Sequence, residues 1–211
     1  MRRGTILVSL ALAVVFATTA IAGAGSGEVS LDDQKAWAQW AFGDSGAPLL
    51  DPSNCGEVVD GAFFLTVAGP DPGTRRVQCE VAAGVPLLAT PGGAIAWAPT
   101  DGTTDNQLHK TLLSVYLAPL VLDSVRVKVD GVLLPRQPLV IPEPYDMPLE
   151  PGNLIQTVDP SVIGDSTRVD IGFFFSWIDG LDPGTHTIVT ADKFQGLGRF
   201  RTIFEFTVTE Y

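Results

Sequence analysis

Three stretches near the carboxyl end of the chain decide the fold class: RVDIGFFFSWI at 168–178, THTIVTA at 185–191 and FRTIFEFTVT at 200–209. Each is rich in β-branched and aromatic residues, and Gly, Pro and Asp gather between them. In the last stretch Phe204 and Phe206 alternate with polar residues, so they share one face of a strand. We interpret the three stretches as the strands that close the chain.

Earlier segments have the same character. The further expected strands are Ala62–Ala68, Arg75–Val81, Val85–Ala89, Ala94–Ala98, Ser124–Val129 and Val132–Leu134. The first two are expected to form a hairpin through the turn GPDPG, and the last two are joined by Asp130-Gly131, which favours a type I′ turn. Short strands with regular turn signals predict an all-β protein, an antiparallel two-sheet β-sandwich that is immunoglobulin-like or jelly-roll-like.

One or two short helices are expected beside the sheets. Leu31–Phe42 and Gln107–Val121 carry apolar residues at helical spacing. Gly43–Gly56 is rich in loop-forming residues, and Pro135–Pro151 contains too many prolines for a central strand. We expect the proline-rich segment to be an edge strand or a long crossing loop.

The amino terminus has the pattern of a signal peptide. Arg2 and Arg3 precede the apolar run 6–16, and small residues end at Ala22. The run is too short and too interrupted for a bilayer span. We therefore predict a signal peptide at 1–22, cleavage after Ala22, and a single domain at 23–211 that has no membrane span and is either secreted or periplasmic.

The predicted mature chain is strongly acidic. The whole sequence has 13 Lys and Arg against 24 Asp and Glu, and removal of Arg2 and Arg3 leaves 11 minus 24, or −13. This charge argues against a nucleic-acid partner and against adhesion to anionic membranes.

Cys55 and Cys79 are the two cysteines of the sequence. In an exported chain they are expected to form a disulfide, which the chain-entropy relation values at about 3.5 kcal/mol. In Arg75–Val81 polar residues alternate with Val77, Cys79 and Val81, so Cys79 is expected to point into the core.

Three residues could suggest catalysis. Gly43-Asp44-Ser45-Gly46 resembles the nucleophile loop of trypsin-like proteases, but His109 and His186 both follow Ser45, and no Ala-Ala-His-Cys motif is present. We interpret Ser45 as a loop residue, His186 as a residue at the start of a strand, and His109 as a helix-surface residue.

Metal binding has little support in the sequence. Zinc would lack ligands if both cysteines are paired, whereas oxygen ligands for calcium occur at Asp101, Asp105 and Asn106, and at Asp179 and Asp182. None of these groups matches an EF-hand loop, so we predict no cofactor and keep Asp101 and Asp105 as the calcium candidates.

Aromatic residues are the best candidates for ligand binding. Phe173, Phe174 and Phe175 are consecutive and cannot share one face of a strand, so one of them needs a cover or lies exposed. We predict binding residues at Phe174, Trp177 and Trp97, with core packing as the alternative role for these large side chains.

Several motifs resemble a family of uncharacterised secreted bacterial β-sandwich proteins. In chain order they are Trp37-x2-Trp40, Pro48-Leu49-Leu50-Asp51 before Cys55, the run GAFFL at 61–65, Cys79-Glu80-Val81, the run VDGV at 129–132, and the run LDPGTHTI at 181–188. The sequence departs from the family pattern at 81–85, where it reads VAAGV and lacks the family's lysine. The resemblance implies the fold and export, and it implies no activity.

These observations leave three functional hypotheses. The first is a non-enzymatic binding or surface-associated module, whose partner is a surface glycan or a protein. The second is a secreted hydrolase with a carboxylate pair or a site based on His186, which requires two titratable groups that converge in a cleft. A pocket that contains His186 or His109 beside an acid would distinguish it. The third is a structural component of the envelope or matrix.

Overall fold

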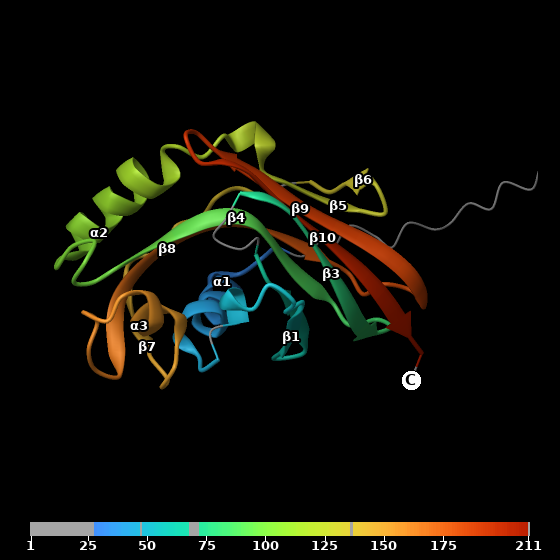
Figure 1. Cartoon of the computed structure of the whole chain (residues 1–211), viewed down its shortest axis with the longest axis horizontal. Coiled ribbons are helices and arrows are strands. Elements are labelled where there is room, and N and C mark those ends of the chain that lie inside the picture. Colours follow the sequence, from blue (N-terminus) through green and yellow to red (C-terminus); the bar gives the residue numbers. More distant parts are fainter. Residues whose placement is uncertain (1–27, 47, 68–71, 136, 211) are drawn as a thin grey trace, which may run out of the picture.

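A computed structural model describes residues 28–46, 48–67, 72–135 and 137–210. The chain forms two five-stranded sheets with short helices around them (Figure 1). Residues 1–22, the predicted signal peptide, lie outside the described residues. Within the described part, no helix has the length and apolar character needed to cross a bilayer.

The strands divide between the sheets without regard to chain order. The first sheet has the order β1 (Gly56–Val59), β2 (Ala62–Leu65), β4 (Leu87–Trp97), β8 (Ser166–Ile178), β7 (Tyr145–Pro148). The second has the order β3 (Gly73–Ala82), β10 (Gly198–Thr209), β9 (Gly184–Phe194), β5 (Arg126–Val129), β6 (Val132–Leu133).

The strands expected at the end of the chain are present as β8, β9 and β10, and β9 pairs with both β5 and β10. The hairpin at Asp130-Gly131 is also confirmed. Asp130 has a φ of 49° and Gly131 a φ of 84°, the positive values that a type I′ turn requires, and the turn joins β5 to β6.

The predicted hairpin between Ala62–Ala68 and Arg75–Val81 is wrong. Strand β2 belongs to the first sheet and β3 to the second, where β3 pairs with β10 in parallel. A turn signal marks the end of a strand but does not determine which sheet the next strand enters. The pairing of β2 with β4 is parallel as well, so the sheets are not purely antiparallel.

The two strands expected at Val85–Ala89 and Ala94–Ala98 are one continuous strand, β4. Its register against β8 shifts between Ala89 and Gly92, which marks an irregularity of the β-bulge type. The proline-rich segment contributes the short strand β7 at the edge of the first sheet. Of the two expectations for this segment, an edge strand or a long crossing loop, the edge strand is confirmed.

The helices begin where polar side chains cap them. Ser30 and Asp33 form a capping box at the start of α1 (Leu31–Ala38), and Thr104 and Gln107 form one at α2 (Asp105–Thr111). The remaining helical elements are η1 (Gln39–Gly43), η2 (Pro48–Leu50), η3 (Leu112–Leu117), η4 (Leu122–Ser124) and α3 (Leu154–Val158).

The first sheet is buried on both faces. Towards the second sheet, Phe63 and Leu65 pack against Phe204 and Phe206. On the opposite face, side chains of β4 and β8 pack against α1, η1 and α3, which lie beneath the arch of β4 and β8 in Figure 1. The molecule therefore has three layers, with helices on one side and the second sheet on the other.

A disulfide between Cys55, just before β1, and Cys79 in β3 links the two sheets covalently. The two Cα atoms are 5.7 Å apart, and Cys79 is buried within the core between the sheets. Both the predicted pairing and the inward direction of Cys79 are confirmed.

Candidate functional site

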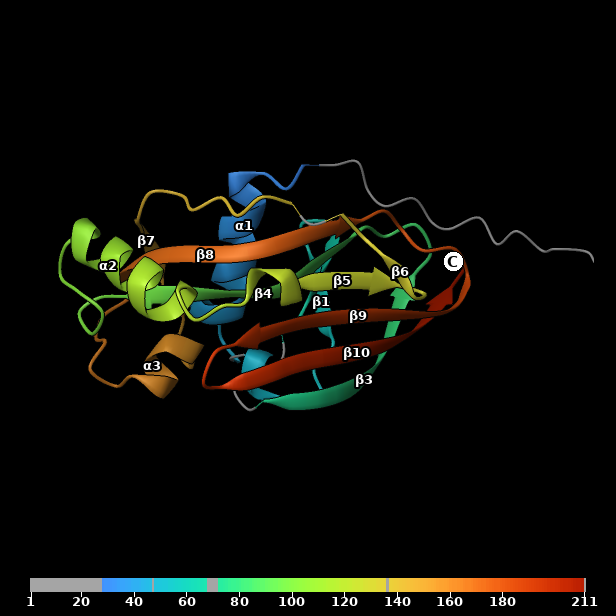
Figure 2. The ribbon, with the colours of Figure 1, turned by 90° about the horizontal axis from the view of Figure 1, so that it is seen from above.

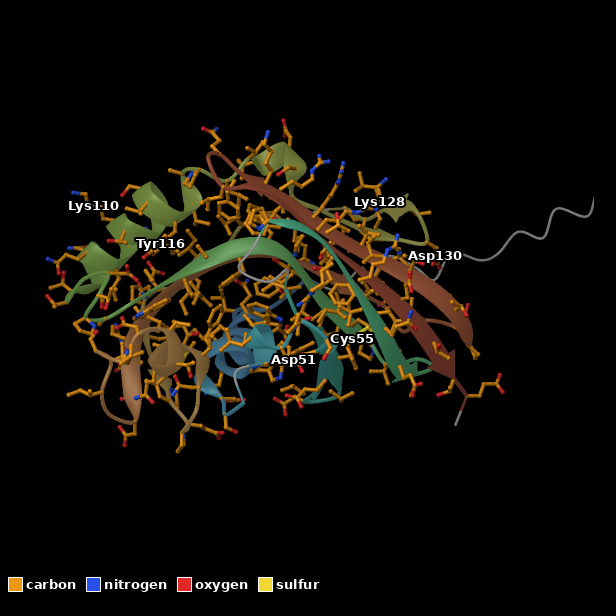
Figure 3. All side chains as sticks on the ribbon, viewed as in Figure 1. Asp51, Cys55, Lys110, Tyr116, Lys128 and Asp130 are labelled. Atoms are coloured by element: carbon orange, nitrogen blue, oxygen red, sulfur yellow. A yellow bond between two sulfur atoms is a disulfide. The ribbon has the colours of Figure 1, made fainter. Side chains whose placement is uncertain are left out.

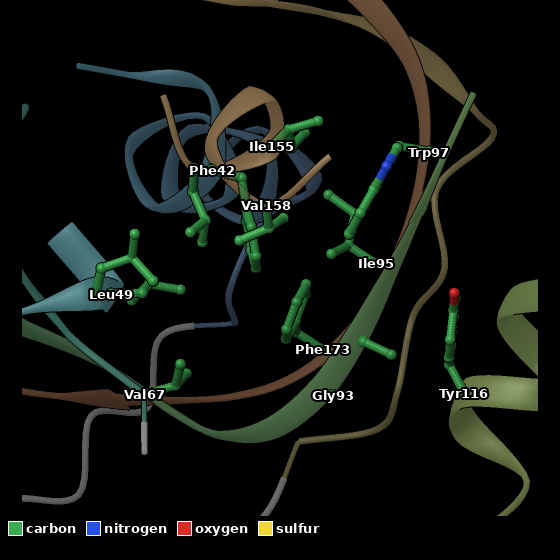
Figure 4. A pocket seen from close by; sticks show the side chains of 13 residues that line it. Phe42, Leu49, Val67, Gly93, Ile95, Trp97, Tyr116, Ile155, Val158 and Phe173 are labelled. Atoms are coloured by element: carbon green, nitrogen blue, oxygen red, sulfur yellow. The ribbon is translucent and has the colours of Figure 1, made fainter. Parts of the chain in front are cut away.

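An apolar cavity of about 410 Å³ lies on the helix-covered face of the first sheet. Its walls come from β4, β8, η1, η2 and α3, and Figure 4 shows their side chains pointing into it. The lining includes Phe42, Leu49, Ile95, Ile155, Val158 and Phe173. Because almost every contributing side chain is hydrocarbon, the cavity suits an apolar group.

The cavity reaches around one edge of β4. It touches the consecutive residues Gly93, Ala94 and Ile95, whose side-chain positions alternate between the two faces of the strand. It also touches Tyr116 of η3, which contacts the core cluster on the opposite face of β4. A space that meets both faces of one strand must include the strand's edge.

Among the described residues, that edge of β4 has a neighbouring strand only at the beginning of β4. Strand β2 pairs with β4 at Leu87 and Leu88, and the register ends there. From Gly92 to Trp97, β4 pairs with β8 on its other side. Within the described ranges, the second half of β4 is therefore a sheet edge on the side of the cavity.

The hydrogen-bond pattern shows which peptide groups face this edge. The Ala98 N–H donates to the Arg168 carbonyl at 2.9 Å, towards β8, and the Trp97 N–H donates to Asp101 Oδ2 at 3.0 Å, away from β8. Alternation along an antiparallel strand then directs the peptide groups of Ile95 and Gly93 to the open edge as well. In the described part of the chain, no hydrogen bond is found for the outward N–H and C=O groups of Gly93 and Ile95.

Gly93 also keeps β4 close to β8. A Cβ atom at this position would clash with the Gly172 carbonyl oxygen and with Phe173. A side chain there would push the strands apart and remove part of the cavity wall. The absence of a side chain is thus a requirement of the site's shape.

Two aspartates lie at the rim of the cavity. Trp97 Nε1 donates to Asp159 Oδ2 at 2.9 Å, and the Tyr116 hydroxyl donates to Asp101. Hydrogen bonds from Ser161, then from Thr100 and Trp97, hold the pKa of Asp159 well below its usual range. Burial, followed by the bond to Asp101, raises the pKa of Tyr116 to about 12. The rim is therefore negatively charged at neutral pH.

The structure separates the three predicted binding residues. Trp97 is half-buried and lines the cavity. Trp177 is half-buried and packs on the same helix-covered face, but it pairs with Leu88, nine residues or roughly 30 Å along β4 from Trp97. Phe174 is buried, 3% exposed, with Leu120 and Val125 on the opposite face. The three do not form one platform.

Of the two alternatives for the consecutive phenylalanines, a cover or an exposed ring, the structure shows a cover, because Phe173, Phe174 and Phe175 are all buried. Phe173 and Phe175 pack against Trp37 of α1, at centroid distances of 5.0 and 5.7 Å. Phe173 was not among the predicted binding residues, although it lines the cavity. Its signal was Trp37, a large aromatic residue on a helix that had to cover something.

Both calcium candidates are engaged with other side chains or backbone groups. Asp105 accepts hydrogen bonds from Arg168 at 2.9 and 2.8 Å, which lowers its pKa, and Asp101 accepts from Trp97 and Tyr116. No group of three or more His, Cys, Asp or Glu residues that could hold a metal ion occurs in the described ranges.

Each histidine does lie beside an acid. His109 Nδ1 is 2.9 Å from Oδ2 of the fully buried Asp170, and His186 Nδ1 is 2.7 Å from Asp130 Oδ2. His186 Nε2 also contacts the Asp182 carbonyl at 2.9 Å, so both ring nitrogens face oxygen atoms and the ring links β9 to the turn at Asp130. This arrangement holds a turn in place.

Neither imidazole lines the apolar cavity, and none of the hydrogen bonds found for the described residues joins an imidazole to a hydroxyl group. The backbone N–H of Ser45 donates to Glu150 Oε2 at 3.2 Å, in the loop that follows η1. Among the described residues, the histidine-acid pairs are therefore not joined to a hydroxyl nucleophile of the kind that a serine hydrolase uses, and they lie outside the apolar cavity.

No protein-family model and no curated protein matches the sequence. A chain in the solved complex of PbICP-C with falcipain-2 aligns with 70% of this chain and 98% of its own length, with 12% identity and a TM-score of 0.31. A likeness of this size carries no argument about fold or function.

Proposed function

We propose that the protein is a non-enzymatic binding module that holds an extended segment of a partner protein against the open edge of β4, with an apolar side chain of that segment in the cavity. One observation carries the proposal: the apolar cavity and the outward peptide groups of Gly93 and Ile95 lie at the same strand edge. The proposal does not depend on whether the sandwich is immunoglobulin-like or jelly-roll-like, which stays a prediction.

The edge selects a polypeptide as the ligand. Strand addition supplies main-chain hydrogen bonds, and pockets for alternate side chains supply the specificity. Gly93 and Ile95 each offer one N–H and one C=O along the edge. An added strand would lie about 4.8 Å from β4, and every second side chain would project towards Ile155 and Val158.

The lining argues against a glycan at this place. A sugar needs polar partners for its hydroxyl groups, and the cavity offers mainly the side chains of aliphatic and phenyl residues. The indole nitrogen of Trp97 is already bonded to Asp159. Of the two partner classes that the sequence left open, the protein partner fits this cavity better.

The rim adds a charge preference. Asp101 and Asp159 flank the end of β4, and the sequence as a whole has a net charge of −11. A segment with an apolar anchor and basic neighbours would complement both features.

The cavity gives less support to the hydrolase hypothesis and to the hypothesis of a structural component. An imidazole-based hydrolase requires His186 or His109 in a cleft, and both rings lie outside this cavity, whose described lining also contains no carboxylate. A purely structural component is expected to show no cleft, whereas this chain has one. Secretion, by contrast, stays a prediction from the sequence.

The proposal can be tested by selecting peptides from a random linear display library on oxidised residues 23–211. Enriched sequences should contain an aromatic or aliphatic anchor next to Lys or Arg. Val158, which is 53% exposed at the lip of the cavity, provides the test variant, and Ile163, 84% exposed and outside the lining, provides the control. Val158→Asp should weaken a selected peptide at least about tenfold, and Ile163→Asp should leave it within about twofold.

Hydrogen exchange on the same complex tests the backbone pairing. The amides of Gly93 and Ile95 should become protected when the peptide is added, because strand addition supplies their missing acceptors. Binding that Val158→Asp leaves intact, or that protects neither amide, would contradict the proposal.

A further inference from the structure

The outer face of the second sheet carries a cluster of basic side chains that the cavity does not use. Along β5, Val127 and Val129 are buried, so Arg126 and Lys128 point outwards. Figure 2 looks onto this side of the molecule and shows β5, β9 and β10 next to one another. In Figure 3 Lys128 lies on the side away from α1.

The strand register places these side chains on two parallel walls. Ala191 of β9 pairs with Arg126 of β5 on one side and with Arg201 of β10 on the other. Lys193 of β9 pairs with Arg199 of β10. A hollow of about 170 Å³ lies between the walls, and its lining is Arg126, Lys128, Val189, Ala191, Arg199 and Arg201.

The floor of the hollow consists of small and apolar side chains. Ala191 is 3% exposed and Ile203, which pairs with Val189, is 4% exposed, although both lie on the outer face of the sheet. The alkyl parts of the long basic side chains cover such residues and leave the charged ends in water. The result is a trough along β9 with cationic walls, and Lys193 lies farther along β9, beside Arg199. We call this the basic trough (Arg126, Lys128, Lys193, Arg199 and Arg201).

The charges of the basic trough are not neutralised within the described structure. No ion pair is found there for any of its five side chains. Glu205, which is on the same face of β10, is held by Arg76 at 2.8 Å and by Gln78 at 2.7 Å.

The clustering of basic side chains on one face is unexpected in a chain with so many acidic residues. Residues 23–211 contain eleven Lys and Arg against twenty-four Asp and Glu, and five of those eleven lie in the basic trough. Gathering cations on one face of an acidic chain costs repulsion between like charges, which a bound anion would relieve.

We propose that the basic trough binds a linear anionic polysaccharide laid along β9. This site is separate from the cavity at β4 and has a different ligand. Residues two apart on a strand repeat every 6.6 Å or so, and the walls stand about 10 Å apart. A chain with carboxylate or sulfate groups at intervals can place several of them against the arginine side chains, which bind such groups in a bidentate manner.

The shape and the overall charge favour a thin polymer over a bilayer. Exposed charges act over about 10 Å at moderate salt, so a narrow chain in the trough responds mainly to the five cations. A broad anionic membrane would also face the negative surface around them. Binding of single-stranded nucleic acid usually adds aromatic stacking, and the trough floor has only aliphatic side chains.

The test uses oxidised residues 23–211 and immobilised dextran sulfate and polygalacturonate, with neutral dextran as the reference. Both polyanions should bind at low salt and weaken as NaCl is raised, because each contact releases counterions. Arg126→Gln combined with Arg201→Gln should reduce the affinity at least about tenfold.

Lys35→Gln combined with Lys110→Gln is the matched control, since it removes the same charge from α1 and α2. It should change the affinity less than about twofold, and thermal unfolding should be similar for both double variants. An equal loss of affinity in the two double variants would show that binding depends only on total charge, and this would overturn the proposal. The proposal would also be overturned if the native chain did not bind either polyanion.

Two further ligands decide the class of polymer. Tighter binding of oligothymidylate or of phosphatidylglycerol vesicles than of dextran sulfate would overturn the choice of a polysaccharide. Val158→Asp at the cavity should leave polysaccharide binding unchanged, so this proposal and the proposed function can fail separately.

Discussion

The space between the two sheets has two unlike ends. Near the disulfide the facing side chains are apolar: Phe63 of β2 packs edge-on against Phe206 of β10 at 5.9 Å, and Val77 and Cys79 of β3 lie in the same cluster. Farther along the same strands, the inward positions of β9 and β10 are taken by Thr190, Asp192 and Thr202. We call these the apolar end and the polar end.

The polar end contains buried atoms without hydrogen-bond partners in the described structure. Asp192 is 5% exposed and Thr202 is fully buried, yet Asp192 Oδ1 and Thr202 Oγ1 are unpartnered. A Cβ atom on Gly92 would clash with Asp192, so this side chain nearly touches the backbone of β4. Each unpartnered group costs about 1–3 kcal/mol of stability.

The difference between the ends indicates a division of roles. The polar end lies directly beneath the basic trough, since Asp192 is between Ala191 and Lys193, and beside Gly93 at the open edge of β4. The apolar end and the disulfide hold the sheets together. Proteins commonly depart from ideal packing near functional sites, which agrees with the position of both proposed sites at the polar end.

The largest expected effect is at the apolar end. Phe206→Ala removes a fully buried ring and should lower the free energy of unfolding by about 4 kcal/mol, measured by urea denaturation. Phe200→Ala, at the half-buried ring that packs on Phe194 near the polar end, is the comparison and should cost less than half as much. Equal losses would show that the two ends do not differ in packing.

The disulfide gives the second effect. Replacing Cys55 and Cys79 by Ala should lower the free energy of unfolding by about 3.5 kcal/mol, because the unfolded chain regains the freedom of the closed loop. Urea unfolding with and without reductant measures it. The reductant should lower the free energy of unfolding of the native chain and leave that of the double variant unchanged. A loss of stability in both proteins would show that the reductant acts on something other than the disulfide.

Asp192 gives the third effect, which depends on pH. Burial raises its pKa from 3.8 to about 7. Between these values the folded state keeps a proton that the unfolded state has lost, so the stabilisation is complete below pH 4 and is lost as the pH rises through 7. From pH 5 to pH 8 the native chain should lose about 2.5 kcal/mol through this group.

Asp192→Asn isolates that loss. The asparagine does not ionise, so the variant should change less with pH and should exceed the native chain in stability at pH 8. Urea unfolding at the two pH values measures both. Parallel pH curves for the two proteins would contradict a raised pKa at Asp192.

Local patterns in the sequence predict those parts of the fold that neighbouring residues determine. Alternation predicts β10, and Asp130-Gly131 predicts the turn between β5 and β6. A second pair, Asp60-Gly61, has similar positive φ values of 50° and 85° and joins β1 to β2, but no strand was predicted between the loop that ends at Gly56 and the strand that begins at Ala62. That turn signal was available in the sequence.

Sheet membership and the two sites depend on contacts between distant segments. Nothing within Arg75–Val81 indicates that β3 pairs with β10, more than a hundred residues later. The walls of the basic trough come from Arg126 in β5 and Arg201 in β10, so no short motif contains them. The phenylalanines of β8 are all buried because α1 covers Phe173 and Phe175 on one face and Leu120 and Val125 pack on Phe174 on the other, which only the tertiary structure shows.

The smallest expected effect compares the two ends at matched positions of the second sheet. Thr202→Val replaces a buried, unpartnered hydroxyl by a methyl group of similar size, and it should raise the free energy of unfolding by about 1 kcal/mol. Val77→Thr makes the reverse change at the apolar end, where Val77 is 3% exposed, and should lower it by about 1–3 kcal/mol. Urea unfolding of both variants at one pH gives the two signs. If Thr202→Val also destabilised the protein, the hydroxyl would have a partner in solution, and the polar end would be a satisfied network like those that order a core.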